Sequence, residues 1–103
     1  MAGAKKEVKD DSYYRVEGWM RNKLGLKGNR LHIYAIIYSF SKSSKGWYTG
    51  SQSYIAEWCG ISRGRAIEIL KELTEKQLIE KREISYRRGH VCNYRVILSE
   101  DKM

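Results

Sequence analysis

The sequence predicts a mostly helical α+β domain in which a β-hairpin follows a series of short helices. Apolar residues recur at helical spacing up to about residue 78 and then alternate with polar residues towards the C-terminus. Glycine and serine separate these segments, and the chain contains no proline. Its 103 residues, 42% of them hydrophobic, suffice for one domain with a single small core.

We expect the folded domain to cover residues 13–98, between a flexible polar arm over 1–12 and a polar tail over 99–103. No segment approaches about 18 consecutive apolar residues, which argues against a membrane protein. The arm is rich in Lys and Asp, so we expect neither a signal peptide nor a membrane anchor there. Two cysteines do not make a disulfide framework, which favours a cytoplasmic location.

The first helix is expected over residues 16–24, because the apolar side chains of this segment fall on one face. That face would carry Val16, Trp19, Met20 and Leu24. Gly25 and Gly28 are then expected to break the chain.

A second helix is expected over residues 30–42, with Asn29 as its N-cap. Its side chains are apolar nearly all round, so other parts of a protein must cover it on several sides. In a domain this small, it is either the central helix or a helix that also meets a second copy of the chain. The second case would make the protein a homodimer through residues 30–42.

Two further helices follow a very short predicted strand, Trp47-Tyr48-Thr49, which glycines bracket. Ser51 is expected to cap a helix over Gln52–Cys59, and Gly60 to end that helix with a positive φ. Ser62 is expected to cap the next helix, which runs to about Gln77. The apolar residues of this last helix share one arc: Ala66, Ile69, Leu70 and Leu73.

A β-hairpin is expected to close the domain. Apolar residues alternate with others in its second strand, where Cys92, Tyr94, Val96 and Leu98 form the inward set. Ile84 and Tyr86 alternate with polar neighbours in the first strand, and Arg88-Gly89 supplies the turn. This order of elements predicts a winged helix-turn-helix: a three-helix core, a C-terminal hairpin wing and a short extra N-terminal helix.

The helix-turn-helix signal lies within residues 55–62. Ala56 is small where the two helices must cross, and Gly60 follows four residues later where the chain must turn tightly. Apolar residues flank both positions. Such a motif places the N-terminus of its second helix where it can enter the major groove of DNA.

The charge distribution supports a polyanionic partner. The formal net charge is +8, and the segments 13–45 (+6) and 84–95 (+3) supply the excess. The second of these segments coincides with the predicted wing, whereas the first has no predicted role.

The predicted recognition helix, residues 62–77, carries most of the candidate DNA contacts. Arg63 and Arg65 lie in its first turn and could each donate two hydrogen bonds to guanine. Glu68 could accept from cytosine and Ile67 could touch a thymine methyl group, while Gly64 would allow close backbone approach. The full set of candidates on this helix is Ser62, Arg63, Gly64, Arg65, Ile67, Glu68 and Lys71.

Two other groups could contact the sugar-phosphate backbone. The wing, residues 84–95, offers Arg87, Arg88 and His90 to phosphates or to a minor groove; the alternative is a solvated turn. The helix that starts after Ser51 could hold a phosphate at its N-terminus; the alternative for Ser51 is an ordinary cap, and both can apply. The residues of this second group are Ser51, Gln52 and Ser53.

The spacing of residues in the sequence indicates neither a catalytic site nor a metal site. The histidines and cysteines show neither Cys-x-x-Cys nor His-x-x-x-His spacing, so we expect no zinc site. Paired carboxylates, a nucleophile with its base and a Gly-rich phosphate loop are all missing from the sequence. We therefore expect a protein that is not an enzyme and has no cofactor, small-molecule substrate or membrane partner.

Several segments resemble the winged-helix domains of replication-associated proteins of bacterial mobile elements, phages and plasmids. They are residues 18–20, 24–29, 34–41 and 61–81. The run from Leu73 to Lys81 is similar to L-x-x-K-G-L-I-x-K, with Gln77 in place of the glycine. The N-terminal domain of DnaD-type primosome proteins is similar in style, and MarR-like repressors share the helix-wing core.

The resemblance implies double-stranded DNA binding, by a transcriptional regulator or a replication-associated factor. With the residues above, it leads to a sequence-recognising protein whose recognition helix enters the major groove while the wing lies on the backbone or in the minor groove. The alternative is a winged-helix interaction or oligomerisation module of a replication complex, with little DNA specificity of its own.

Overall fold

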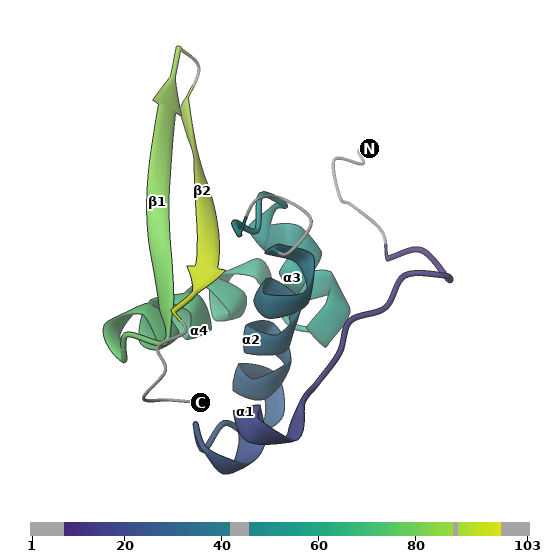
Figure 1. Ribbon diagram of the computed structural model, residues 1–103. Helices are drawn as coiled ribbons and strands as arrows, with labels where there is room; N and C mark the ends of the chain where they lie inside the picture. Colours follow the sequence, from purple (N-terminus) through teal and green to yellow (C-terminus); the bar gives the residue numbers. More distant parts are fainter. Residues whose placement is uncertain (1–7, 42–45, 88, 98–103) are drawn as a thin grey trace.

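Helices and a hairpin follow one another in the predicted order, as Figure 1 shows. The computed structural model describes residues 8–41, 46–87 and 89–97. Leu98, the predicted tail and most of the predicted arm lie outside these residues. The described elements are α1 (Gly18–Asn22), α2 (Gly28–Ser41), α3 (Gln52–Cys59), α4 (Arg63–Glu75), β1 (Ile79–Tyr86) and β2 (Gly89–Val96).

The first two helices differ from their predicted boundaries. Helix α1 is limited to 5 residues inside the predicted segment 16–24. Helix α2 begins at Gly28, so the predictions that Gly28 breaks the chain and that Asn29 caps the helix are wrong. The reason is that the carbonyl of Lys27 already accepts the N–H of Leu31 at 3.4 Å, while Gly28 adopts the positive φ of +58° that turns the chain into the helix.

Helix α2 is the central helix of the domain. Its five consecutive residues from Ile33 to Ile37 are each at most 1% exposed, which one covered face alone could not achieve. Helices α1, α3 and α4 and strand β2 all contact it. The central-helix interpretation is therefore confirmed, whereas a homodimer through residues 30–42 stays a prediction.

The helix-turn-helix forms as its caps predict. The hydroxyl of Ser51 accepts the N–H of Tyr54 at 3.0 Å, and that of Ser62 accepts the N–H of Arg65 at 3.1 Å. Gly60 has φ +66° between the two helices. Buried Ala56 and Ala66 belong to the common core, so small residues lie on both helices of the motif.

Helix α4 ends at Glu75, two residues before the predicted end. Gln77 then adopts φ +62°, a conformation that usually favours glycine. The N–H of Leu78 returns to the carbonyl of Leu73 at 3.0 Å, which closes the helix and directs the chain into β1. The positive-φ ending therefore forms although glutamine occupies its position.

The hairpin is longer than predicted, because β1 starts at Ile79, directly after the helix. The pairing runs from Ile79 opposite Val96 to Tyr86 opposite Gly89. The predicted short strand is confirmed only as a single bridge, in which Tyr48 and Tyr94 exchange two backbone hydrogen bonds. Within the described residues, no helix is long and apolar enough to span a bilayer.

The base of the hairpin packs on the helices, and its far end is exposed. Tyr94 and Ile79 are buried, and Cys92 and Val96 are half-buried on the same face, as the alternation predicts. Asn93 lies on the opposite face from these residues, and it is also buried. The reason lies on its own face of the hairpin, where the guanidinium groups of Arg82, opposite Asn93, and Arg95 both lie over the ring of Trp47.

Candidate nucleic-acid interface

Parts of all three predicted contact groups surround one groove. It has a volume of about 310 Å³ and lies between the start of α3, the start of α4 and strand β2. Its lining residues are Thr49, Gly50, Ser51, Gln52, Arg63, His90, Val91 and Cys92. The structure thus brings together Ser51, Gln52, Arg63 and His90, which are up to 39 positions apart in the sequence.

A chain of hydrogen bonds holds Arg63 at this groove. Its guanidinium donates to the Gln52 side-chain oxygen at 2.9 Å, and the Gln52 amide nitrogen donates to the Tyr94 hydroxyl at 3.0 Å. Tyr94 is anchored in the core. Gln52, predicted as a phosphate contact, therefore acts within the protein to connect α4, α3 and β2, and it orients the first arginine of the recognition helix.

Arg65 lies on the same first turn and pairs with Glu68. Their side chains are 3.1 Å apart and 45% and 69% exposed. An ion pair this exposed contributes little to stability, so a ligand can displace it at small cost. Both side chains are accordingly available to a partner that offers a better acceptor and donor.

The remaining predicted residues of α4 fall into two sets. Ser62 and Gly64 are exposed at the start of the helix. Ile67 and Lys71 instead line a second groove, of about 220 Å³, between α4 and the hairpin, where Lys81 and Tyr94 also lie. Ile67 is half-buried there, so it is less accessible than the sequence suggested.

Glycine at position 64 has no packing reason within the described residues. A Cβ atom added there would meet nothing closer than the Ser62 hydroxyl oxygen, at 4.0 Å. Gly64 lies in a helix, where glycine is about 1 kcal/mol less favourable than alanine. The fold could therefore accept alanine at this position.

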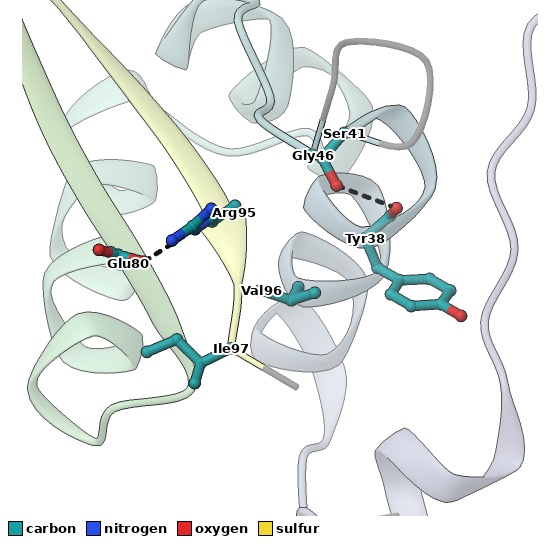
Figure 2. A pocket seen from close by; sticks show the side chains of 7 residues that line it. All are labelled: Tyr38, Ser41, Gly46, Glu80, Arg95, Val96 and Ile97. Carbon is teal, nitrogen blue, oxygen red and sulfur yellow. Dashed lines mark hydrogen bonds and ion pairs between the residues drawn. The ribbon is translucent and has the colours of Figure 1, made fainter. Parts of the chain in front are cut away.

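The basic residues of the hairpin are less available than the charge count suggests. Arg95 donates to Glu80 at 2.8 Å near the hairpin base, as Figure 2 shows, and its guanidinium lies 4.6 Å from the Trp47 ring centroid. Arg87 is exposed near the turn and makes no ion pair with any other described residue. The predicted contact Arg88 lies outside the described residues. Among the described basic residues of the hairpin, Arg87 alone has neither an ion pair nor a ring contact.

Some cations of the unexplained segment 13–45 also serve the fold. Arg30 donates to Glu72 at 2.6 Å and so connects α2 to α4, while Arg15 lies 3.7 Å from Glu17. The hydrogen bond from Arg30 is the main reason why the pKa of Glu72 lies below its usual value, and the same bond raises the pKa of Arg30. Part of the excess charge therefore holds helices together.

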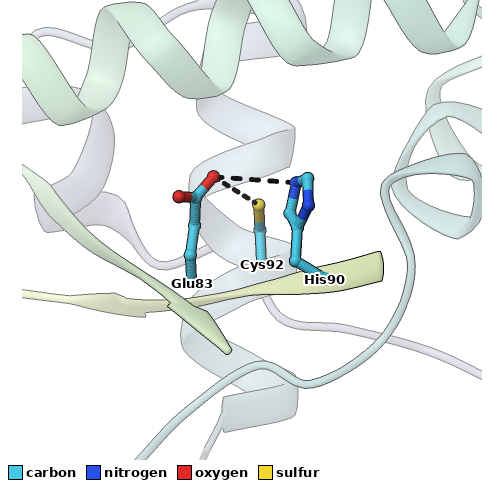
Figure 3. A group of neighbouring side chains, drawn as sticks. All are labelled: Glu83, His90 and Cys92. Atoms are coloured by element: carbon cyan, nitrogen blue, oxygen red, sulfur yellow. Dashed lines mark hydrogen bonds and ion pairs between the residues drawn. The ribbon is translucent and has the colours of Figure 1, made fainter. Parts of the chain in front are cut away.

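A group on the hairpin was missed at the sequence level. Glu83, His90 and Cys92 stand side by side on one face, with their ligand atoms within 4.8 Å of one another (Figure 3). Local spacing rules do not detect it, because Glu83 comes from the opposite strand. The one available signal is that His90 and Cys92 are two positions apart in a predicted strand and so share a face.

A family model described as a helix-turn-helix domain matches residues 24–79 of the chain. The match covers more than half of the chain, from the residues just before α2 to the first residue of β1. Comparison with curated proteins and with solved structures found no match. The matched segment contains α3, the turn and α4, and it ends before the rest of the hairpin.

Proposed function

The chain belongs to the helix-turn-helix domain family, and from this premise we propose that it binds double-stranded DNA and recognises its sequence. Helix α4 enters the major groove, and the hairpin lies on the backbone or in the adjacent minor groove. The observation that carries the proposal is the pair of exposed arginines in the first turn of α4, beside a groove that the start of α3 and the hairpin also line.

Base recognition is assigned to the first turn of α4. Arg63 and Arg65 donate to guanine O6 and N7, and Gln52 holds Arg63 in the orientation this needs. The ion pair between Glu68 and Arg65 opens, and Glu68 accepts a hydrogen bond from a cytosine. Ile67 and Lys71 contact the DNA at the edge of the recognised bases. The helix can carry alanine at position 64 without a clash in the chain, so we attribute the glycine to close approach of DNA.

Backbone contacts are assigned to two other places. Ser51 and Ser53 with the first N–H groups of α3 bind one phosphate, in addition to the capping role of Ser51. Arg87, Arg88 and His90 contact phosphates from the wing. These contacts add affinity for any duplex and position α4 over the bases.

The cellular role that we propose is that of a cytoplasmic transcriptional regulator or replication-associated factor. The resemblance of residues 73–81 to winged-helix replication proteins supports the second of these. A second candidate function is that of an interaction module, favoured by the exposed apolar side chains Ile84, Tyr86 and Val91 on the hairpin. Sedimentation distinguishes them: a strict monomer at high concentration removes self-association as the role of these side chains.

Salt dependence of duplex binding tests DNA binding itself. Fluorescence anisotropy with a labelled pool of random duplexes, between about 50 and 200 mM salt, should show log affinity falling linearly with log salt, by about 0.9 per phosphate contacted. Arg63→Ala should weaken binding. Arg21→Ala is the matched control, because it removes one exposed positive charge on α1, at the end of the molecule away from the hairpin tip (Figure 1).

Two results would contradict the proposal. One is the absence of measurable duplex binding at the lowest salt. The other is an equal loss of affinity in Arg63→Ala and Arg21→Ala, since binding would then follow total charge and not the first turn of α4.

A further inference from the structure

The hairpin presents three different metal-binding groups on the face that lines the groove. The imidazole Nε2 of His90 and the Sγ of Cys92 each lie 3.8 Å from the same oxygen, Oε2 of Glu83. All three ligand atoms fall within 4.8 Å of one another. Figure 3 shows the side chains rising from one side of the hairpin towards a common point.

The pairing of the strands makes this convergence a property of the backbone. Glu83 is directly opposite Cys92, and His90 is two positions from Cys92 on the same strand. Residues that are directly opposite, or two apart, point to the same side of a hairpin. The three side chains therefore start from neighbouring positions on one face of the hairpin for as long as the strands stay paired.

The distances suit a tetrahedral ion. Zinc lies about 2.3 Å from sulfur and about 2.0–2.2 Å from imidazole nitrogen or carboxylate oxygen, so tetrahedral geometry separates neighbouring ligand atoms by about 3.3–3.7 Å. The separations of 3.8 Å from Glu83 Oε2 to His90 Nε2 and to Cys92 Sγ exceed this range by at most a few tenths of an ångström. Glu83 and His90 are more than half exposed, so rotation of their side chains can close the remaining distance.

We propose that Glu83, His90 and Cys92 bind one divalent transition-metal ion of the zinc class, a site beyond the DNA-binding function. A thiolate, an imidazole and a carboxylate together favour zinc or cobalt over magnesium or calcium, which prefer oxygen ligands. Cys92 binds as the thiolate, so its thiol proton passes to solvent as the S–metal bond forms. Three protein ligands leave the fourth position to water.

A neighbouring positive charge, that of Lys81, opposes the ion. The ammonium of Lys81 lies 3.9 Å from Glu83 Oε2, the oxygen that the other two groups approach. A bound cation must displace this contact and tolerate the like charge. Replacing Lys81 with glutamine should therefore tighten metal binding, an effect that a nonspecific thiol–metal contact would not show.

Cobalt titration of the full chain tests the site directly. With a reductant that does not bind metals, Co²⁺ should give one equivalent per chain, a thiolate-to-cobalt charge-transfer band and visible bands of tetrahedral intensity; Zn²⁺ should abolish them. Cys92→Ala and His90→Ala should each weaken binding by about 100-fold, and Glu83→Gln by about tenfold, the two ends of the range for losing an outer-shell partner. Circular dichroism confirms that each variant is folded.

Cys59→Ala is the matched control. Cys59 is the other free cysteine, half-buried in α3, where burial raises the pKa of its thiol. Its removal should leave the cobalt spectrum and affinity unchanged. The inference is overturned if the chain binds no Co²⁺, if Cys92→Ala binds Co²⁺ as tightly as the parent chain, if binding is lost in Cys59→Ala, or if the stoichiometry is half an ion per chain. None of these measurements uses DNA, so they are independent of the proposed function.

Discussion

The helical part of the molecule and the hairpin distribute burial and charge in opposite ways. Helix α4 buries Ala66, Ile69, Leu70 and Leu73 completely and exposes its first-turn arginines to solvent. The hairpin buries residues only near its base, and most of its charged side chains pair with one another there or stack on Trp47. The difference indicates that the helices carry the fold and orient the base-contacting residues, while the hairpin adds contacts that are individually weaker.

Shortening one apolar side chain in each region should give the largest difference in stability between the two regions. Leu73→Ala removes a fully buried side chain of α4 and should lower the free energy of unfolding by about 2–5 kcal/mol. Ile84→Ala changes a side chain that is 42% exposed and should stay within about 0.5 kcal/mol. Urea unfolding followed by circular dichroism measures both. Equal losses would mean that the far end of the hairpin belongs to the core, which would contradict the conclusion that the helices carry the fold.

Alanine should have opposite effects on stability at two glycines, Gly50 just before α3 and Gly64 at the start of α4. A Cβ atom at Gly50 would lie 2.5 Å from the hydroxyl oxygen of Tyr48, a buried side chain that donates to the Ser51 carbonyl. Gly50→Ala should therefore destabilise the protein by about 1–3 kcal/mol. Gly64→Ala meets open space in a helix and should stabilise it by up to about 1 kcal/mol.

The same Gly64→Ala variant should bind duplex DNA more weakly despite its higher stability, because its methyl group points into the proposed interface. Thermal unfolding and anisotropy on one preparation give both values. Tighter DNA binding by this variant would contradict close approach at position 64.

Removing an arginine should affect DNA binding differently in the two regions. Arg65→Ala should reduce the preference for the best duplex over an unrelated one by about 1–3 kcal/mol. Arg87→Ala should weaken all duplexes about equally and lower the salt slope by about 1, because it removes one phosphate contact. Affinity measurements on matched and mismatched duplexes separate these outcomes, and a reversed result would assign base recognition to the wing.

The smallest expected effect concerns the ion pair that joins α2 to α4. Hydrogen bonding to Arg30 lowers the pKa of Glu72 in the folded protein below its value in the unfolded chain, which is near 4.5. The ionised carboxylate therefore stabilises the fold when the pH is above the pKa of the unfolded chain. This contribution is lost as the pH falls through the lower pKa of the folded protein. Glu72→Gln should therefore show a shallower fall in urea midpoint below pH 4.5 than the parent chain. Glu75→Gln, an exposed carboxylate on the same helix, should keep the parent slope.

The helix-turn-helix could be predicted because its signals are local. Ser51, Gly60 and Ser62 each determine a helix end through bonds to residues at most four positions away, and the structure confirms all three. The start of α2 could not be predicted in this way. Its first turn depends on the carbonyl of Lys27 and on a positive φ at Gly28, and a glycine there is equally compatible with a break.

The hairpin partners could not be predicted, because they depend on the register of two strands. Until Tyr86 is known to lie opposite Gly89, nothing assigns Glu80 to Arg95 or Glu83 to Cys92. The role of Gln52 has the same origin, since its two partners, Arg63 and Tyr94, lie 11 and 42 positions away. The sequence therefore indicates where the basic residues lie, but not which of them pair with an acidic or amide side chain in the folded protein.

Selection of bound duplexes from a random library most directly tests the central claim that the first turn of α4 recognises base sequence. The full chain should enrich one defined motif, and Arg65→Ala should relax the preference at one position of that motif while leaving the others in place. No enriched motif for the full chain, or the same motif at the same enrichment for Arg65→Ala, would contradict the claim.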